Sequence, residues 1–186
     1  MRALDDVFAL ILTLNRIKPH PSLPKRLGPL LSDLKKPLPS RDPKELAELV
    51  HALWISNRDA KAEQLMADAI AAIDQQKPEQ AKELIEKLMR LCPAWSEAYY
   101  KRAIVALMLN NPSEAVSLLG ETVRLEPRHF AAISLFGQIC LDHNRLHEAR
   151  AALQIALEMN PHLKGVADTI SAIHRKLIAE DNRLNG

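Results

Sequence analysis

Few residues in this sequence combine the types and spacing that catalysis or metal binding requires. His143 and His147 are four residues apart, a spacing that suits a zinc ion when both lie on one continuous helix. The recurrence of prolines every 34 residues predicts a turn between two helices at residues 142–145, so the two imidazoles do not share a helix face. No cysteine or acidic residue lies at the spacing of a third ligand. We therefore expect no metal site.

The nucleophilic side chains have no predicted catalytic partners. A serine or cysteine nucleophile needs an adjacent base, and neither Ser117 nor Ser134 has a predicted neighbour of that kind. Cys140 falls at a core position and Cys92 directly precedes a proline that ends a helix, so both are interpreted as small hydrophobic residues. The five glycines are scattered and form no phosphate-binding loop. The sequence predicts a protein that is not an enzyme and has no cofactor.

Composition favours a soluble helical protein with a core of its own. The chain has 186 residues, of which 47% are apolar and 26% charged, and it has 5 Gly against 12 Pro. Many alanines and leucines with few glycines favour helices over a β-sandwich or barrel. The formal net charge of +2 indicates no particular partner, and two cysteines cannot form a disulfide framework.

The N-terminal segment, residues 1–16, is predicted to be an amphipathic helix. Its apolar run at residues 7–12 is far shorter than the roughly 20 residues of a membrane span, so no span is expected. A secretory signal needs a basic start and a small-residue cleavage site. Here Arg2 is followed by two aspartates, and no such site follows the apolar run. A degenerate signal is the alternative.

Residues 17–42 are predicted to be a proline-rich basic linker. Seven of the 12 prolines lie between residues 19 and 43, which disfavours a long helix and favours extended chain. Between Arg16 and Arg41 there are seven lysines or arginines against one acid, Asp33. The short apolar patch 27–34 has the composition of one or two helical turns that dock on the body. The segment lacks interleaved aromatics and a helical basic face, so no nucleic acid is expected, although an anchor to anionic lipid or nucleic acid is an alternative.

The remaining prolines follow a fixed period. Pro93, Pro127 and Pro161 recur every 34 residues, and Pro78 and Pro112 are separated by the same interval. Proline is favoured at the first position of a helix and cannot continue one. One set therefore starts the second helix of a repeat and the other ends it. A 34-residue period in a helical chain is that of the tetratricopeptide repeat.

The residues at equivalent positions make the chain resemble a tetratricopeptide-repeat protein. The repeats are 62–95, 96–129 and 130–163. A bulky residue is expected at the fourth position, and small residues at the eighth and twentieth, where helices cross closely. The fourth positions are Leu65, Tyr99 and Ile133, the eighth are Ala69, Ala103 and Gly137, and the twentieth are Ala81, Ala115 and Ala149. The predicted fold is all-α, a helical-repeat solenoid with about three helix pairs, a C-terminal capping helix and extra N-terminal helices.

The seventh position departs from the pattern in two repeats. Asp68 and Arg102 occupy it where Phe136 follows the usual apolar preference. Opposite charges at equivalent positions of neighbouring repeats predict an inter-repeat ion pair, and the alternative is that both side chains extend to the edge of the solenoid.

Two further helices flank the repeats. Residues 43–61 are predicted to form an N-terminal capping helix that starts at Asp42-Pro43 and pairs with the first helix of repeat one. Residues 164–180 are predicted to form a capping helix with an apolar stripe against the last repeat and a charged outer face.

The resemblance implies a concave groove lined by the first helix of each repeat. The groove positions read onto this sequence are Met66, Ile70, Ile73, Tyr100, Lys101, Ile104, Leu107, Met108, Leu135 and Gln138. Lys101 is the one cation among them, so we do not expect a preference for an acidic C-terminus. Exposed apolar patches usually mark interfaces. An amphipathic helix or apolar peptide, foreign or from the same chain, is therefore expected around Tyr100, Ile104 and Leu107, unless some of these residues are buried between helices.

The sequence thus predicts a non-enzymatic protein-interaction module with a protein or peptide partner. The alternative is a self-assembling structural protein, a homo-oligomer in which the N-terminal helix is swapped into a neighbour's groove. The sequence by itself favours the cytoplasm. The resemblance to small bacterial tetratricopeptide-repeat proteins, many of which carry export signals, also raises the periplasm.

Overall fold

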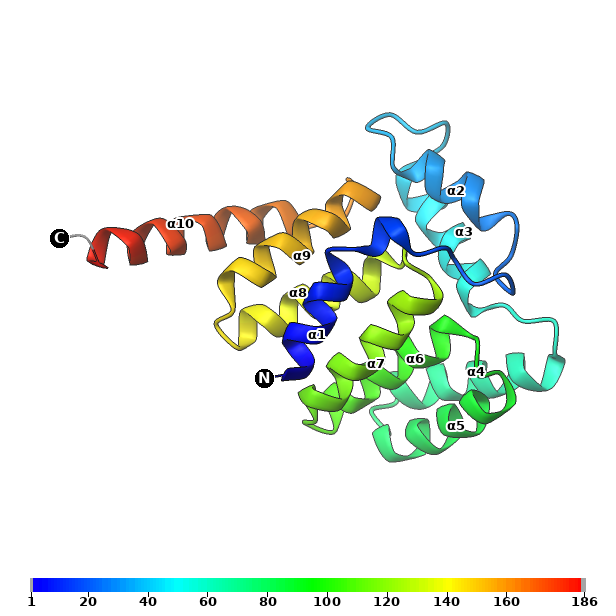
Figure 1. Cartoon of the computed structure of the whole chain (residues 1–186). Coiled ribbons are helices and arrows are strands. Elements are labelled where there is room, and N and C mark those ends of the chain that lie inside the picture. Colours follow the sequence, from blue (N-terminus) through cyan, green and yellow to red (C-terminus); the bar gives the residue numbers. More distant parts are fainter. Residues whose placement is uncertain (1, 185–186) are drawn as a thin grey trace.

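The computed structural model describes residues 2–184, which form an all-helical solenoid (Figure 1). The first and second helices of each pair lie antiparallel, and the pairs stack side by side. The pairs are α4 (Ala60–Asp74) with α5 (Pro78–Leu91), α6 (Ser96–Met108) with α7 (Pro112–Leu125), and α8 (Phe130–Asp142) with α9 (Leu146–Met159). The final helix, α10 (Val166–Leu184), packs against α9. The all-α helical-repeat fold predicted from the sequence is confirmed.

The periodic residues explain the local structure of each pair. Pro78 and Pro112 occupy the first positions of α5 and α7, where a missing N–H costs no intrahelical hydrogen bond. The turns inside the three pairs each contain one residue with a positive φ, namely Gln76 (56°), Asn110 (56°) and Asn144 (55°). These three residues also recur every 34 residues, because each repeat reverses direction with the same left-handed turn.

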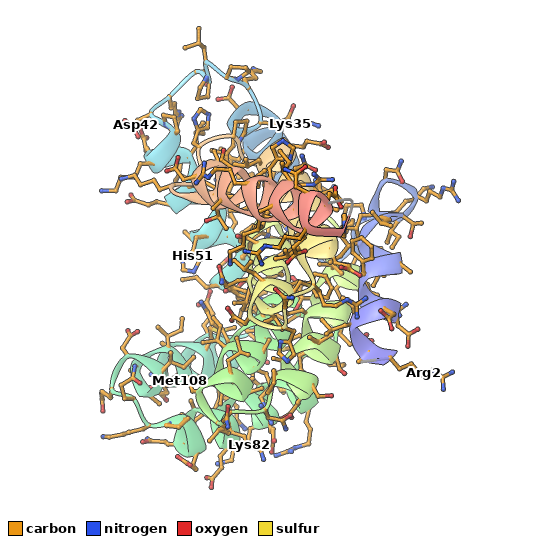
Figure 2. The ribbon with its side chains drawn as sticks, turned by 90° about the vertical axis from the view of Figure 1, so that its left-hand side faces the viewer. Arg2, Lys35, Asp42, His51, Lys82 and Met108 are labelled. Carbon is orange, nitrogen blue, oxygen red and sulfur yellow. The ribbon has the colours of Figure 1, made fainter. Side chains whose placement is uncertain are left out.

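Two additional helical units precede the repeats and lie on opposite sides of the stack (Figure 2). Helix α1 (Arg2–Ile11), followed by a 3₁₀ turn at Leu14–Arg16, packs on α7 and α9. Helix α2 (Leu27–Leu34) lies within the proline-rich segment and pairs with α3 (Pro43–Ile55). The expectation that residues 43–61 pair with the first helix of repeat one is wrong. The helix ends at Ile55, and its apolar face is occupied by α2 and by the start of α8.

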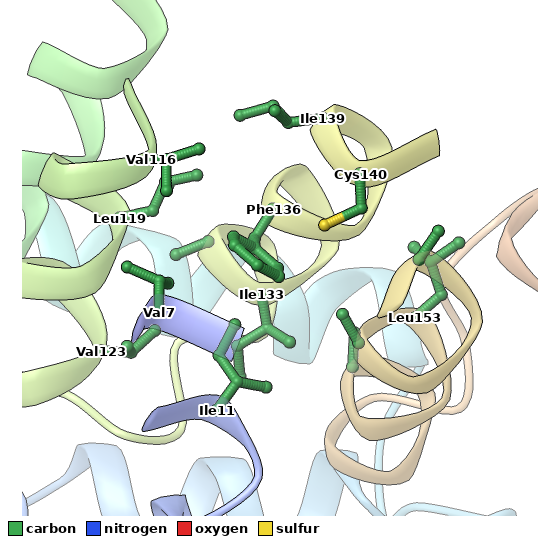
Figure 3. Packing of buried hydrophobic residues seen from close by; sticks show 14 of the residues in the cluster. Val7, Ile11, Val116, Leu119, Val123, Ile133, Phe136, Ile139, Cys140 and Leu153 are labelled. Atoms are coloured by element: carbon green, nitrogen blue, oxygen red, sulfur yellow. The ribbon is translucent and has the colours of Figure 1, made fainter. Parts of the chain in front are cut away.

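The largest hydrophobic cluster joins α1 to the second and third helix pairs (Figure 3). Val7 and Ile11 of α1 are 7% and 2% exposed and pack among Val116, Leu119 and Val123 of α7. A second cluster lies within α4, α5 and α6, and a third joins α2 and α3 to Phe130. The α1 segment is therefore part of the core.

The expected ion pair between Asp68 and Arg102 does not form. Asp68 is exposed and accepts a hydrogen bond from Gln64 on its own helix, at 2.8 Å. Arg102 is 3% exposed and pairs with Glu114 of α7 and, at 3.6 Å, with Glu86 of α5. The second helices on either side of α6 each present a glutamate to Arg102, whereas Asp68 is on the surface.

Within residues 2–184, no helix combines the length and the apolar character that crossing a bilayer requires.

Candidate functional site

The first helices α4, α6 and α8 form one side of the stack, and α1 lies on the other. Figure 2 shows α1 on the right and α3 on the left of the repeats. The N-terminal helix therefore does not occupy the expected groove on the first helices. The chain instead places α3 across the N-terminal ends of α6 and α8.

The ten expected groove residues differ in exposure. Met66 is 1% exposed and belongs to the cluster beneath α4 and α5, so it is a core residue. The Lys101 side chain is 11% exposed. Gln138 is exposed, and seven residues are half-buried, namely Ile70, Ile73, Tyr100, Ile104, Leu107, Met108 and Leu135.

The apolar stripe of α3 covers the part of this side that is formed by the N-terminal ends of α6 and α8. Its residues Leu46, Val50 and Trp54 pack with Phe130 at the start of α8. The Trp54 ring stacks on the His129 ring with centroids 4.1 Å apart and planes 7° apart. The backbone carbonyl of Trp54 also accepts a hydrogen bond of 2.7 Å from the indole N–H of Trp95. Residues from α3 and from the starts of α6 and α8 thus meet at one point.

A buried glutamate and histidine lie beneath α3. Glu97 and His129 are both fully buried, and His129 Nε2 lies 2.9 Å from Glu97 Oε2. His129 Nδ1 accepts a hydrogen bond from the Ala132 amide at 3.1 Å, which caps the start of α8. Because Nδ1 is an acceptor, Nε2 carries the proton and donates to the carboxylate. The pair therefore links the first turn of α6 to the first turn of α8.

Lys101 neutralises the same carboxylate. Its Nζ lies 3.1 Å from Glu97 Oε1 and 5.4 Å from the centre of the Tyr100 ring. Burial by itself raises the pKa of Glu97, but the hydrogen bond from His129 and the positive charge of Lys101 outweigh it, so the pKa is lowered. Burial first, and then the negative charge of Glu97, raise the pKa of Tyr100 to about 12. The cluster contains a charged Glu97 and a neutral Tyr100 at physiological pH.

Farther along the first helices, the same side carries apolar side chains that are only partly buried. Ile104 and Met108, one turn apart on α6, are half-buried. Neither packs against any of the three hydrophobic clusters found among residues 2–184. Ile70 and Ile73 of α4 and Leu135 of α8, on the two neighbouring first helices, do pack against those clusters but keep part of their surface exposed. These partly exposed apolar residues belong to three successive first helices.

Groups suited to metal binding are not found in the described chain. No set of three or more histidine, cysteine or acidic side chains within residues 2–184 could hold a metal ion. His143 is the C-cap of α8, and its Nδ1 lies 2.9 Å from the carbonyl oxygen of Ile139, while His147 belongs to α9.

Sequence reasoning did not predict the contact between Glu97 and His129 or the stacking of Trp54 on His129. Glu97 is the second residue of its repeat and His129 is the last, so the repeat register places them at the starts of neighbouring first helices. That register was a usable signal. The position of Trp54 over them had no such signal, because α3 lies outside the repeats.

Comparisons with known proteins agree with the fold. Residues 100–163 match the family described as tetratricopeptide repeat. A curated relative, a TPR repeat-containing protein of Rhizobium etli, is 25% identical over 160 residues, covering 84% of this chain and 77% of the relative.

Two solved structures illustrate the structural likeness. The first TPR of Spaghetti (RPAP3), bound to the HSP90 peptide SRMEEVD, has a TM-score of 0.60 at 23% identity, covering 63% of this chain and 94% of that one. The Yersinia enterocolitica type III secretion chaperone SycD, in complex with a peptide of the translocator YopD, has a TM-score of 0.59 at 18% identity, covering 64% and 98%.

Proposed function

We propose that this chain, which is a tetratricopeptide-repeat protein, is a non-enzymatic interaction module that binds an apolar helix or peptide of a partner protein. The binding surface is the part of the first-helix side that α3 leaves open. It comprises Ile70, Ile73, Ile104, Leu107, Met108, Leu135 and Gln138.

The observation that carries this proposal is the partial exposure of Ile104 and Met108. A partly exposed isoleucine and methionine one turn apart, outside every cluster of the described residues, leave apolar surface in water. Covering that surface with an apolar partner is favourable by roughly 25 cal/mol for each Å² removed from water. Methionine adapts its shape to different partners, which suits a peptide-binding surface.

The cluster beneath α3 argues against an acidic peptide as the ligand. A carboxylate would need a free cation, and the Lys101 side chain is 11% exposed and already paired with Glu97. The peptides bound by the two solved structures show that this fold accepts short segments. For this surface we expect selection by apolar side chains.

The test is a charge placed on the proposed apolar surface. Ile104→Asp is compared with Ile178→Asp, because Ile178 lies on α10 and is 47% exposed. A partner is recovered from the native cell with the wild-type chain, purified, and measured by calorimetry against each variant. We expect the Ile104 variant to lose binding at least about tenfold and the Ile178 variant to keep it, with unchanged circular dichroism in both. Equal affinity for the wild type and the Ile104 variant would contradict the proposed site.

A second proposal is a homo-oligomer in which copies exchange α1. The exchanged helix would not enter the groove on the first helices that the sequence suggested. Because α1 packs on α7 and α9, an exchange between copies would place it on a neighbour's second helices. Light scattering over a range of concentrations tests this. A dimer that appears with rising concentration supports exchange, and a monomer throughout rules it out.

A further inference from the structure

A second concave surface is formed by α2, α3 and the turn between α5 and α6. A cavity of about 740 Å³ opens between residues 21–26, the end of α3 with the loop after it, and the turn between α5 and α6. Another cavity, of about 480 Å³, opens between α2 and α3. Both are lined by Arg26, Leu53 and Ser56, so the two cavities adjoin one another. We call the joined surface the α2–α3 trough. None of the ten expected groove residues lines it.

The walls of the trough are mostly apolar. Prolines and leucines from the proline-rich segment face apolar residues of α3 and of the α5–α6 turn. Leu23, Pro93 and Ala94 line the larger cavity, and Leu30, Leu49 and Leu53 line the smaller one.

The charges of the trough have one sign. Its charged lining residues are Lys25, Arg26, Arg41 and Arg58, all exposed, and no aspartate or glutamate lines either cavity. Arg41 lies 3.6 Å from Glu45 in a solvent-exposed ion pair, which is a weak competitor for a ligand. The fold brings Arg58, which follows α3, to the cations of residues 25–26. Several cations around a low-dielectric wall attract an anionic partner more strongly than isolated surface charges do.

We infer that the α2–α3 trough is a docking site for an acidic peptide segment that carries bulky apolar side chains. Its carboxylates pair with Lys25, Arg26 and Arg58, and its apolar side chains enter the spaces next to Leu30, Leu49 and Leu53. This site differs from the proposed apolar surface in location and in ligand charge.

The aromatic residues favour a peptide over a nucleic acid. Binding of single-stranded nucleic acid uses exposed aromatic rings on which bases stack. Trp54 and Trp95 are 3% and 7% exposed, because both rings are packed into the body. The trough therefore offers cations and aliphatic surface without a stacking platform.

The experiment uses the full-length chain and a short fluorescein-labelled peptide in which glutamates alternate with leucines and phenylalanines. Two matched probes replace the glutamates by lysines or the apolar residues by serines, and a single-stranded oligonucleotide of equal charge is the fourth. Fluorescence anisotropy measures binding at low and moderate salt. We expect the acidic apolar peptide to bind more tightly than each of the other probes by about tenfold or more. Equal binding of the oligonucleotide or of the serine peptide would overturn the inference.

Charge-reversal variants locate the binding. Arg26→Glu with Arg58→Glu should weaken the acidic peptide at least about tenfold, as should Ala52→Glu at an exposed position of α3. The matched control, Lys87→Glu with Lys176→Glu, makes the same change in net charge on α5 and α10 and should have no comparable effect. Equal weakening by the control pair would show that the attraction is not local, and would overturn the site.

Two further measurements separate this site from the proposed apolar surface. The Ile104→Asp variant should bind the acidic peptide with wild-type affinity. A photo-crosslinking phenylalanine in the peptide should attach to residues 21–30 or 49–58. Crosslinks confined to α4, α6 and α8 would overturn the trough as the site and leave the proposed apolar surface standing.

Discussion

Helices α1 and α3 both lie outside the repeats, and the chain attaches them to opposite sides by different interactions. Helix α1 packs through aliphatic residues, with Val7 seated against Gly120 of α7. A charged contact to the repeats places Asp5 Oδ1 2.7 Å from Arg145 Nη2. Helix α3 packs through the Trp54 ring, over the hydrogen-bonded pair of Glu97 and His129.

The different interactions explain the position of each helix. Aliphatic packing has no preferred direction, so α1 lies wherever shape allows, and the absence of a side chain at Gly120 provides that shape. Ring stacking and buried hydrogen bonds are directional. They hold α3 over the N-terminal ends of α6 and α8, which leaves Ile104 and Met108 uncovered.

The largest expected effect is at the α3 attachment. Trp54→Ala removes a buried indole and should lower the free energy of unfolding by about 3–5 kcal/mol. Trp54→Phe is the control: the Trp54 N–H has no acceptor among the described residues, so phenylalanine loses no hydrogen bond and should cost much less. Urea unfolding followed by circular dichroism gives both values. Similar losses for both variants would show that α3 is not held by the size of the ring.

The same attachment should be sensitive to acid. The pKa of Glu97 is lowered from its ordinary 4.5, so its contribution to stability is complete above that value and is lost as the pH falls through the folded-state pKa. Glu97→Gln should destabilise the chain by about 1–3 kcal/mol near neutral pH. It should also flatten the fall in stability below pH 4.5.

The control for this prediction is Glu48→Gln, which replaces an exposed carboxylate on α3. It should leave the wild-type pH dependence unchanged. The hydrogen bond from Ser40, followed by that from Lys36, lowers the pKa of Asp33 to about 2. Asp33 therefore contributes equally to the acid dependence of stability in the wild type and in both variants. An unaltered acid profile for Glu97→Gln would contradict the charged state assigned to this residue.

A smaller effect is expected at the α1 attachment. A Cβ at Gly120 would lie 2.9 Å from Val7 Cγ2, so Gly120→Leu should displace α1 and cost about 1–3 kcal/mol. Hydrogen exchange should show the amides of residues 5–11 losing protection while α8 keeps its own.

The control for this prediction is Gly28 of α2, where an added Cβ would lie 3.6 Å from Arg128 Nη1. Gly28→Ala should be tolerated and gain up to about 1 kcal/mol in the free energy of unfolding. Retained protection of α1 in Gly120→Leu would argue against the close seat of Val7.

The smallest effect is expected for the ion pair of α1. Asp5→Asn removes the contact with Arg145, which keeps its partner Glu148. The pair is largely solvent-exposed, so the loss should be below about 1 kcal/mol and should shrink at higher salt. Thermal unfolding at two salt concentrations measures it. A loss of several kcal/mol would show that α1 is held by charge more than by Val7 and Ile11.

The sequence by itself determined the repeat architecture, because the information is local and recurs. Pro78, Pro112 and the prolines at 93, 127 and 161 mark where helices start and stop, and small residues such as Gly137 mark where they cross. A Cβ at Gly137 would lie 2.8 Å from Leu153 Cγ, so the close crossing requires glycine there. Each of these constraints acts within one repeat and needs no distant partner.

Tertiary structure alone decided where the non-repeat helices lie and which charges pair. Arg102 pairs with glutamates from α5 and α7, because both second helices approach its side chain and Asp68 stays at the surface. Similarly, α3 lies on α8 because Trp54 meets His129 and Phe130, which are far along the chain. These contacts depend on the shapes and polar groups of surfaces formed only after the repeats have stacked, and no periodicity in the sequence encodes them.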